Sequence, residues 1–150
     1  MISIKHKAVE QISSIVNTRI KEIESEIKET NDSKKNESKS SAGDKYETGR
    51  EMIQQVLNNL ESQLAKYIQM KNELDSINFI AINDIVKAGS LIKTNTSYFL
   101  IAVALGKINI DNIEVYAISI NSPIGNIFKG KKKFDNFEFQ NRAIEILDIS

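Results

Sequence analysis

Apolar residues recur at steps of three and four in the first part of the chain, and they form one series: Val9, Ile12, Val16, Ile20, Ile23 and Ile27. This spacing places them on one face of an α-helix, because such a helix turns once in about 3.6 residues. A second series, broken once at Lys71, alternates steps of four and three: Ile53, Leu57, Leu60, Leu64, Tyr67 and Leu74. Its repeat of about 3.5 residues is typical of a coiled coil. The two series predict two long helices, each with a narrow apolar stripe.

The segment between the two series, from Thr30 to Gly43, is almost entirely polar, which predicts a solvated loop. Neither stripe can be buried alone, so the two helices should pack against each other as an antiparallel hairpin. At about 1.5 Å per residue, helices of about 25–30 residues form a rod about 40 Å long.

The pattern changes near Phe79, where short segments rich in Ile, Val, Phe and Tyr alternate with turn residues. They predict the strands of a small antiparallel sheet with one buried face: 90–94, 98–103, 115–120, 134–139 and 143–149. Before the fourth segment, Ser122 is a typical N-cap, Pro123 suits a first helical turn, and Gly130 can end a helix. These residues predict one short helix between strands.

Together the elements predict an α+β protein. A coiled-coil hairpin is expected over residues 1–77, with its tip loop at 30–46, and a sheet domain with one short helix is expected over residues 78–150.

The composition excludes several classes of function. Twenty basic and 20 acidic residues give a formal net charge of zero, which argues against a protein that coats nucleic acid or an anionic membrane. The absence of cysteine excludes disulfides, thiol catalysis and Cys-ligated zinc. No apolar run approaches the roughly 20 residues of a membrane span, and residues 1–10 lack the apolar core of a signal peptide. We expect a cytoplasmic protein without membrane contact.

Familiar catalytic motifs are missing, so no enzyme is expected. The single histidine, His6, has no triad pattern around it and is interpreted as a surface residue of the first helix. Gly125 and Gly130 do not have the spacing of a phosphate-binding loop. The run from Lys129 to Lys133 is basic, but a short lysine cluster in a turn is usually only solvated.

The tip of the predicted hairpin carries the most informative pair, Asp44 and Glu47. As structural residues they fit an N-cap and the matching acid of a capping box, and both suit the positive end of a helix dipole. As functional residues, two carboxylates three positions apart on a helix lie on one face and can share a divalent cation. Two ligands fall short of a full oxygen shell, so such a cation needs further ligands from a partner. The two roles are compatible, because capping uses one carboxylate oxygen and leaves the other oxygen free to bind a cation.

Two motifs resemble the Gre family of bacterial transcript-cleavage factors, and more closely its short Gre-like members. Residues 41–52 read Ser-Ala-Gly-Asp-Lys-Tyr-Glu-Thr-Gly-Arg-Glu-Met and keep the family's Gly-Asp-x-x-Glu arrangement. Residues 122–125 read Ser-Pro-Ile-Gly and are followed by Gly-Lys at 130–131 and by an Ile-Glu-Ile-Leu strand at 144–147. The order and spacing agree over nearly the full chain.

The resemblance implies both a fold and a function. The C-terminal domain would contain an FKBP-like sheet and dock at the rim of the secondary channel of bacterial RNA polymerase, through Ser122, Pro123, Ile124 and Gly125. The coiled coil would reach inward, and Asp44 and Glu47 would help hold Mg²⁺ at the polymerase active site. That cation would stimulate cleavage of backtracked transcripts by two-metal hydrolysis. The isolated protein would carry no cofactor and would meet nucleic acid only within the transcription complex.

Two other functions are open from the sequence. One is a regulator that enters the same channel and modulates or blocks the polymerase without cleavage, as some Gre homologues and DksA-like proteins do. The other is a plain coiled-coil interaction module, in which Asp44 and Glu47 only cap a helix.

Overall fold

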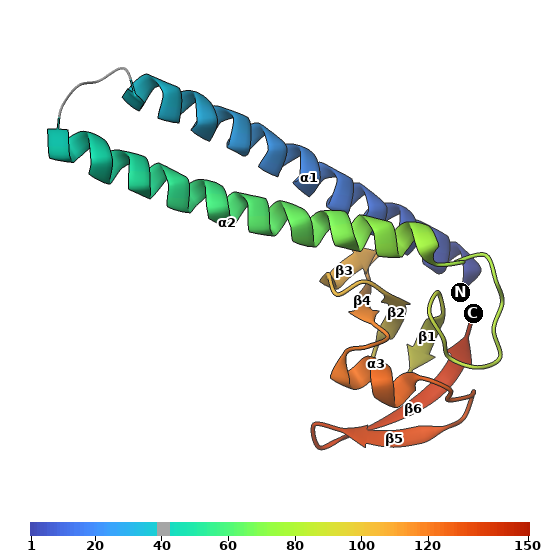
Figure 1. Cartoon of the computed structure of the whole chain (residues 1–150). Coiled ribbons are helices and arrows are strands. Elements are labelled where there is room, and N and C mark those ends of the chain that lie inside the picture. The colour runs from blue at the N-terminus through green and yellow to red at the C-terminus, as the bar shows by residue number, and fades with distance from the viewer. Residues whose placement is uncertain (39–42) are drawn as a thin grey trace. The chain divides into compact units, whose positions relative to one another are not determined.

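The computed structural model describes the backbone of residues 1–38 and 43–150, and the side chains of residues 1–35 and 47–150. In chain order, the elements are α1 (Ile2–Ser38), α2 (Gly43–Ser76), β1 (Leu91–Thr94), β2 (Tyr98–Ala102), β3 (Gly106–Ile110), β4 (Ile113–Ser119), α3 (Pro123–Phe128), β5 (Asn136–Phe139) and β6 (Arg142–Ile149). The chain is therefore an α+β protein with two long helices first and a sheet afterwards, as predicted (Figure 1).

Contacts divide the chain into two compact units. One unit is Ile15–Lys71, and the other combines Met1–Ser14 with Asn72–Ser150. The first turns of α1 and the last turn of α2 thus belong with the sheet. The predicted boundary between a hairpin domain at residues 1–77 and a sheet domain at residues 78–150 stays a prediction.

In the unit Ile15–Lys71, α1 and α2 pack side by side as an antiparallel hairpin (Figure 1). Near the tip, Lys34 Nζ donates a hydrogen bond to Gln54 Oε1 at 2.7 Å. Farther from the tip, the Arg19 guanidinium lies 5.6 Å from the centre of the Tyr67 ring. The later residue of α1, Lys34, thus pairs with the earlier residue of α2, Gln54, and the earlier Arg19 pairs with the later Tyr67. This order is that of an antiparallel pair.

The predicted apolar stripes form the interior of this hairpin. Val16 and Ile23 of α1 and Leu57 and Leu60 of α2 are buried. Lys71, which interrupts the second series, is exposed. The heptad spacing in the sequence thus identified the packed faces correctly.

The predicted loop at Thr30–Gly43 is wrong over most of its length, because α1 continues to Ser38. Polar residues such as lysine and glutamate have high helix propensity when no glycine or proline interrupts them. The Ser33 hydroxyl also bonds within the helix, since it donates to the Glu29 carbonyl at 3.1 Å. Residues 39–42 lie outside the described part of the chain.

The sheet has six strands in the order β3-β4-β2-β1-β6-β5. Neighbours are antiparallel except β2 and β4, which run parallel with Tyr98 opposite Val115. The expected purely antiparallel sheet is therefore wrong, and the sheet is mixed. Strand β3 was not among the predicted strands. It forms because Ile108 and Ile110 alternate with polar residues and are buried against the sheet.

The short helix α3 forms where it was predicted and covers one face of the sheet (Figure 1). Its Phe128 is fully buried, with the Phe99 and Phe137 rings 5.1 Å and 5.0 Å away between centres. Ser122 caps its start, and Gly130 follows its end with a φ of 80°. The core of this unit is thus built around Phe128.

Candidate functional site

The hairpin tip presents a polar hollow between the end of α1 and the start of α2. Its volume is about 590 Å³, and its lining residues are Lys34, Glu47, Arg50, Glu51 and Gln54. One wall is fixed by a short chain of hydrogen bonds, in which Gln54 accepts from Lys34 and donates from Nε2 to Asn58 Oδ1 at 2.9 Å. The hollow therefore brings acidic and basic side chains together beside the predicted acid pair.

Glu47 lies one turn into α2, and its side chain is exposed. Within the part of the chain whose side chains are described, it has no hydrogen-bond or ion-pair partner. A capping box needs this carboxylate to accept a backbone N–H at the helix start. In the described structure the Glu47 carboxylate makes no such bond.

Asp44 is the second residue of α2, since the helix begins at Gly43. It thus lies inside the first turn rather than at the cap position that the sequence predicted. It lies three positions before Glu47, so the two backbone positions share one face of the helix. The Asp44 side chain, like Ser41 and Ala42 of the tip motif, lies outside the described residues.

In the described part of the chain, histidine, aspartate and glutamate side chains do not gather in any group of three or more that could hold a metal ion. Oxygen ligands from Asp44 and Glu47 suit Mg²⁺, which usually keeps several waters and takes one or two protein carboxylates.

The second predicted site, Ser122 to Gly125, is mainly a structural element. The Ser122 hydroxyl accepts from the Gly125 N–H at 3.0 Å and donates to the Ser119 carbonyl at 2.7 Å. Gly125 is buried, and Ile124 packs partly against the core. Pro123 is exposed. Of the four predicted partner-binding residues, Pro123 is thus the one best placed to touch another molecule.

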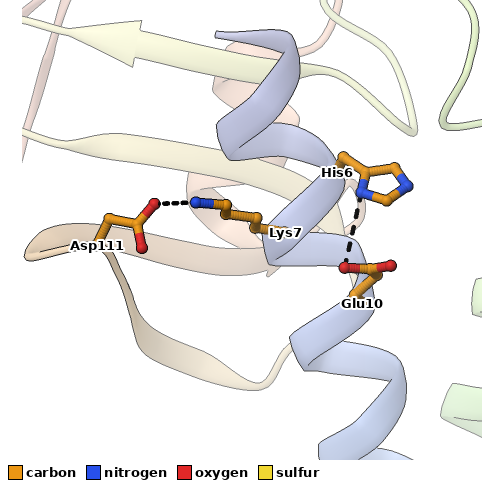
Figure 2. A network of polar contacts seen from close by, with 4 residues as sticks. All are labelled: His6, Lys7, Glu10 and Asp111. Carbon is orange, nitrogen blue, oxygen red and sulfur yellow. Dashed lines mark hydrogen bonds and ion pairs between the residues drawn. The ribbon is translucent and has the colours of Figure 1, made fainter.

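The predicted surface role of His6 is confirmed. Its side chain is 74% exposed, and its Nδ1 lies 3.6 Å from Glu10 Oε2 on the next turn of α1 (Figure 2). No catalytic partner converges on it among the residues drawn around it. The lysine run is also largely solvated: Lys132 and Lys133 are exposed, and Lys133 pairs with Asp148 at 3.2 Å.

Sequence reasoning missed Lys34, Arg50 and Gln54 as neighbours of Glu47. Lys34 was assigned to the solvated loop, so its helical position beside Gln54 was not expected. Once α1 is extended to Ser38, the antiparallel register itself places Lys34 opposite Gln54. The missed signal was therefore the absence of glycine and proline from residues 30–38, together with the helix-forming Lys34, Lys35 and Glu37.

Comparison of the chain with known protein families, curated proteins and solved structures found no match to any of them. Along residues 1–38 and 43–150, no helix combines the length and the apolar character that crossing a bilayer requires.

Proposed function

We propose that this protein is a Gre-like transcription elongation factor that stimulates RNA polymerase to cleave backtracked transcripts. The observation that carries the proposal is the exposed Glu47, which has no partner among the described side chains and lies on the same helical face as Asp44 at the end of a long hairpin. Residues 43–71 of α2 rise about 40 Å at 1.5 Å per residue, which suits a rod that reaches a recessed site. The two motifs shared with the Gre family support the same function.

The proposed chemistry divides the work between two proteins. The factor supplies two carboxylates, and the polymerase supplies the remaining ligands, the first cation and the RNA. A second Mg²⁺ held between them activates water and stabilises charge on the attacked phosphate. The factor itself would then be no enzyme. Docking would use the exposed Pro123 and its surroundings on the FKBP-like C-terminal domain.

The test is a cleavage assay on backtracked elongation complexes from the same host, with RNA length as the readout. Loss of an outer-shell partner of a metal site costs about 10–100-fold, so Asp44→Ala and Glu47→Ala, which remove direct ligands, should slow cleavage at least that much. Glu51→Ala is the matched control, because Glu51 is exposed and lines the same hollow one turn later. It should cleave like the wild type.

Each variant must also be shown to bind polymerase, for example by co-sedimentation with the elongation complex. Cleavage that persists in both Asp44→Ala and Glu47→Ala would refute the proposed chemistry. A failure of the wild-type protein to bind polymerase would refute the whole proposal and leave a coiled-coil interaction module.

A second candidate function is a non-cleaving regulator of the same channel. It is favoured by Lys34 and Arg50, which line the hollow with Glu47 and would oppose a divalent cation there by like-charge repulsion. In that case the protein would inhibit RNA synthesis without shortening the transcript. The same assay separates the two functions, because it follows both elongation and cleavage.

A further inference from the structure

A second cavity lies in the unit formed by Met1–Ser14 and Asn72–Ser150, and it differs in character from the tip hollow. Its volume is about 350 Å³, and its lining residues are Ile2, Lys5, His6, Val9, Phe79, Ile80, Ile82 and Ser150. Most of this lining is apolar. A concave apolar site of roughly 300–1,000 Å³ with a few placed polar groups is the usual form of a small-ligand pocket.

Lys5 supplies a buried positive group to this cavity. It is 5% exposed, and its Nζ donates to the Ala81 carbonyl at 3.2 Å. No carboxylate among the described side chains lies within ion-pair distance of it. Burial lowers the pKa of Lys5, because the charged form loses its hydration. Buried lysines are normally paired, so an anion in the cavity would supply the missing partner.

Ser150 supplies a second unused donor. Its side chain is 7% exposed, and within the described part of the chain its Oγ is a buried polar atom without a hydrogen-bond partner. Leaving a buried hydroxyl unpaired costs about 1–3 kcal/mol, so such groups usually have a partner. Because this oxygen is itself fully buried, an acceptor atom in the cavity would reach it only if the Ser150 side chain turned toward the cavity.

The third polar residue of the lining, His6, is largely exposed, and its Nδ1 lies 3.6 Å from Glu10 Oε2 (Figure 2). The two buried polar groups of the lining are therefore an ammonium, which only donates, and a hydroxyl, which can donate. A ligand head that only accepts hydrogen bonds and carries negative charge matches them, and a carboxylate does both.

We propose that this cavity binds a small aliphatic carboxylate, with its head at Lys5 and Ser150 and its chain against Val9, Phe79 and Ile82. The apolar rim agrees with this orientation, since Ile82 is 74% exposed and Ile80 is 93% exposed beside the cavity. The volume is near the lower end for ligand pockets, which limits the ligand to a short chain. This site is separate from the proposed transcription function and does not depend on it.

The test is a titration of the full-length protein with octanoate, followed by calorimetry and by amide chemical shifts in NMR spectra. Octan-1-ol is the matched probe, because it has the same chain and lacks the charge. A charge-assisted hydrogen bond contributes about 1.5–3 kcal/mol, so octanoate should bind at least about tenfold more tightly than octan-1-ol. The amide shifts should centre on Val9, Ile82 and Ser150.

Lys5→Met keeps the length of the side chain and removes its charge. It should weaken octanoate binding at least about tenfold and remove the preference over octan-1-ol. Lys7→Met is the matched control, because Lys7 lies on the same helix but pairs with Asp111 outside the cavity (Figure 2). Its octanoate affinity should stay unchanged.

Absence of octanoate binding up to its solubility limit would overturn the proposal. Equal affinity for octanoate and octan-1-ol in the wild type would do the same, because it would show a cavity that takes any apolar chain. This second comparison needs no variant, so it decides the matter even where Lys5→Met does not fold.

Discussion

The close approach of α3 to the end of β4 makes Gly125→Ala a sensitive substitution. A Cβ atom at Gly125 would lie 2.0 Å from the Ser119 carbonyl oxygen and 2.9 Å from the carbonyl carbon of Ile120. Ordinary van der Waals contacts begin near 3.4 Å. Both neighbours are backbone atoms, so they cannot rotate away as a flexible side chain would. The first turn of α3 would have to move off the strand.

That movement would disturb contacts beyond the glycine. The Ser122 hydroxyl bond to the Ser119 carbonyl at 2.7 Å would stretch, and Phe128 would be drawn from the core. Overpacking costs about 1–3 kcal/mol and occasionally more. Because α3 has backbone atoms on one side and the core on the other, we expect Gly125→Ala to lower the free energy of unfolding by about 3 kcal/mol, the upper end of this range. For a chain of this size, roughly 2–4 °C per kcal/mol gives a Tm lowered by about 10 °C.

Near-UV circular dichroism is the suitable assay, because the Tyr116 ring stacks 5.6 Å from that of Phe99 and reports on the sheet unit. Gly130→Ala is the control: nothing lies within 4 Å of its added Cβ, and only its φ of 80° opposes alanine. That conformation costs about 1–2 kcal/mol. A Gly125→Ala protein that melts with the wild type, or above Gly130→Ala, would refute the packing argument.

Three further substitutions test other parts of the sheet unit. Phe128→Ala should lower the free energy of unfolding by about 3–5 kcal/mol in urea denaturation, because it empties the centre of the core. A smaller loss of stability than in the Ser122→Ala variant, described next, would contradict this prediction. Ser122→Ala removes the cap of α3 and should cost about 0.5–2 kcal/mol by the same measurement. The hydrogen bond from Lys133 is the main reason why the pKa of Asp148 is lowered from its ordinary value of 3.8. The pair therefore stabilises the folded state at every pH above 3.8. This stabilisation is lost as the pH falls through the lowered pKa of Asp148. Lys133→Met should therefore lower the free energy of unfolding by less than about 1 kcal/mol at neutral pH and leave it unchanged in strong acid. An equal loss at both pH values would contradict a stabilising Lys133–Asp148 pair.

The parts of the fold that local rules control could be predicted from the sequence. The hairpin follows from apolar spacing alone, and α3 follows from a serine cap, a proline and a terminal glycine. Turns also form at Asp111-Asn112 and near Asn141, and their residues have the positive φ values that such turns require. Each of these features depends on residues that are close together in the chain.

Features that depend on distant partners were missed. The parallel pairing of β2 with β4 is set by the whole sheet, and no local pattern reveals it. The cavity beside Lys5 also has no signal in the sequence, because a lysine near the start of a helix is expected to be solvated. Its burial arises only when residues 79–82 and Ser150 pack around it.

The candidate site at the tip was partly predictable. The positions of Asp44 and Glu47 on one helix followed from their spacing, and the structure adds that Glu47 is exposed without a partner among the described side chains. The basic neighbour Lys34 was not foreseen, because it lies beside Glu47 only when α1 is extended and paired with α2. Arg50 was overlooked, although it lies three positions after Glu47 on α2, a spacing that places both on one helical face.

The central claim is that the tip carboxylates share Mg²⁺ with a polymerase, and the Mg²⁺ dependence of cleavage tests it most directly. The rate of RNA shortening in backtracked complexes is measured over a range of Mg²⁺ concentrations, with no factor, with the wild type, and with Glu47→Ala or Glu51→Ala. The wild type and Glu51→Ala should lower the half-saturating Mg²⁺ concentration, and Glu47→Ala should return it to the value without factor while still binding the complex. An identical Mg²⁺ dependence for the wild type and Glu47→Ala would contradict the claim.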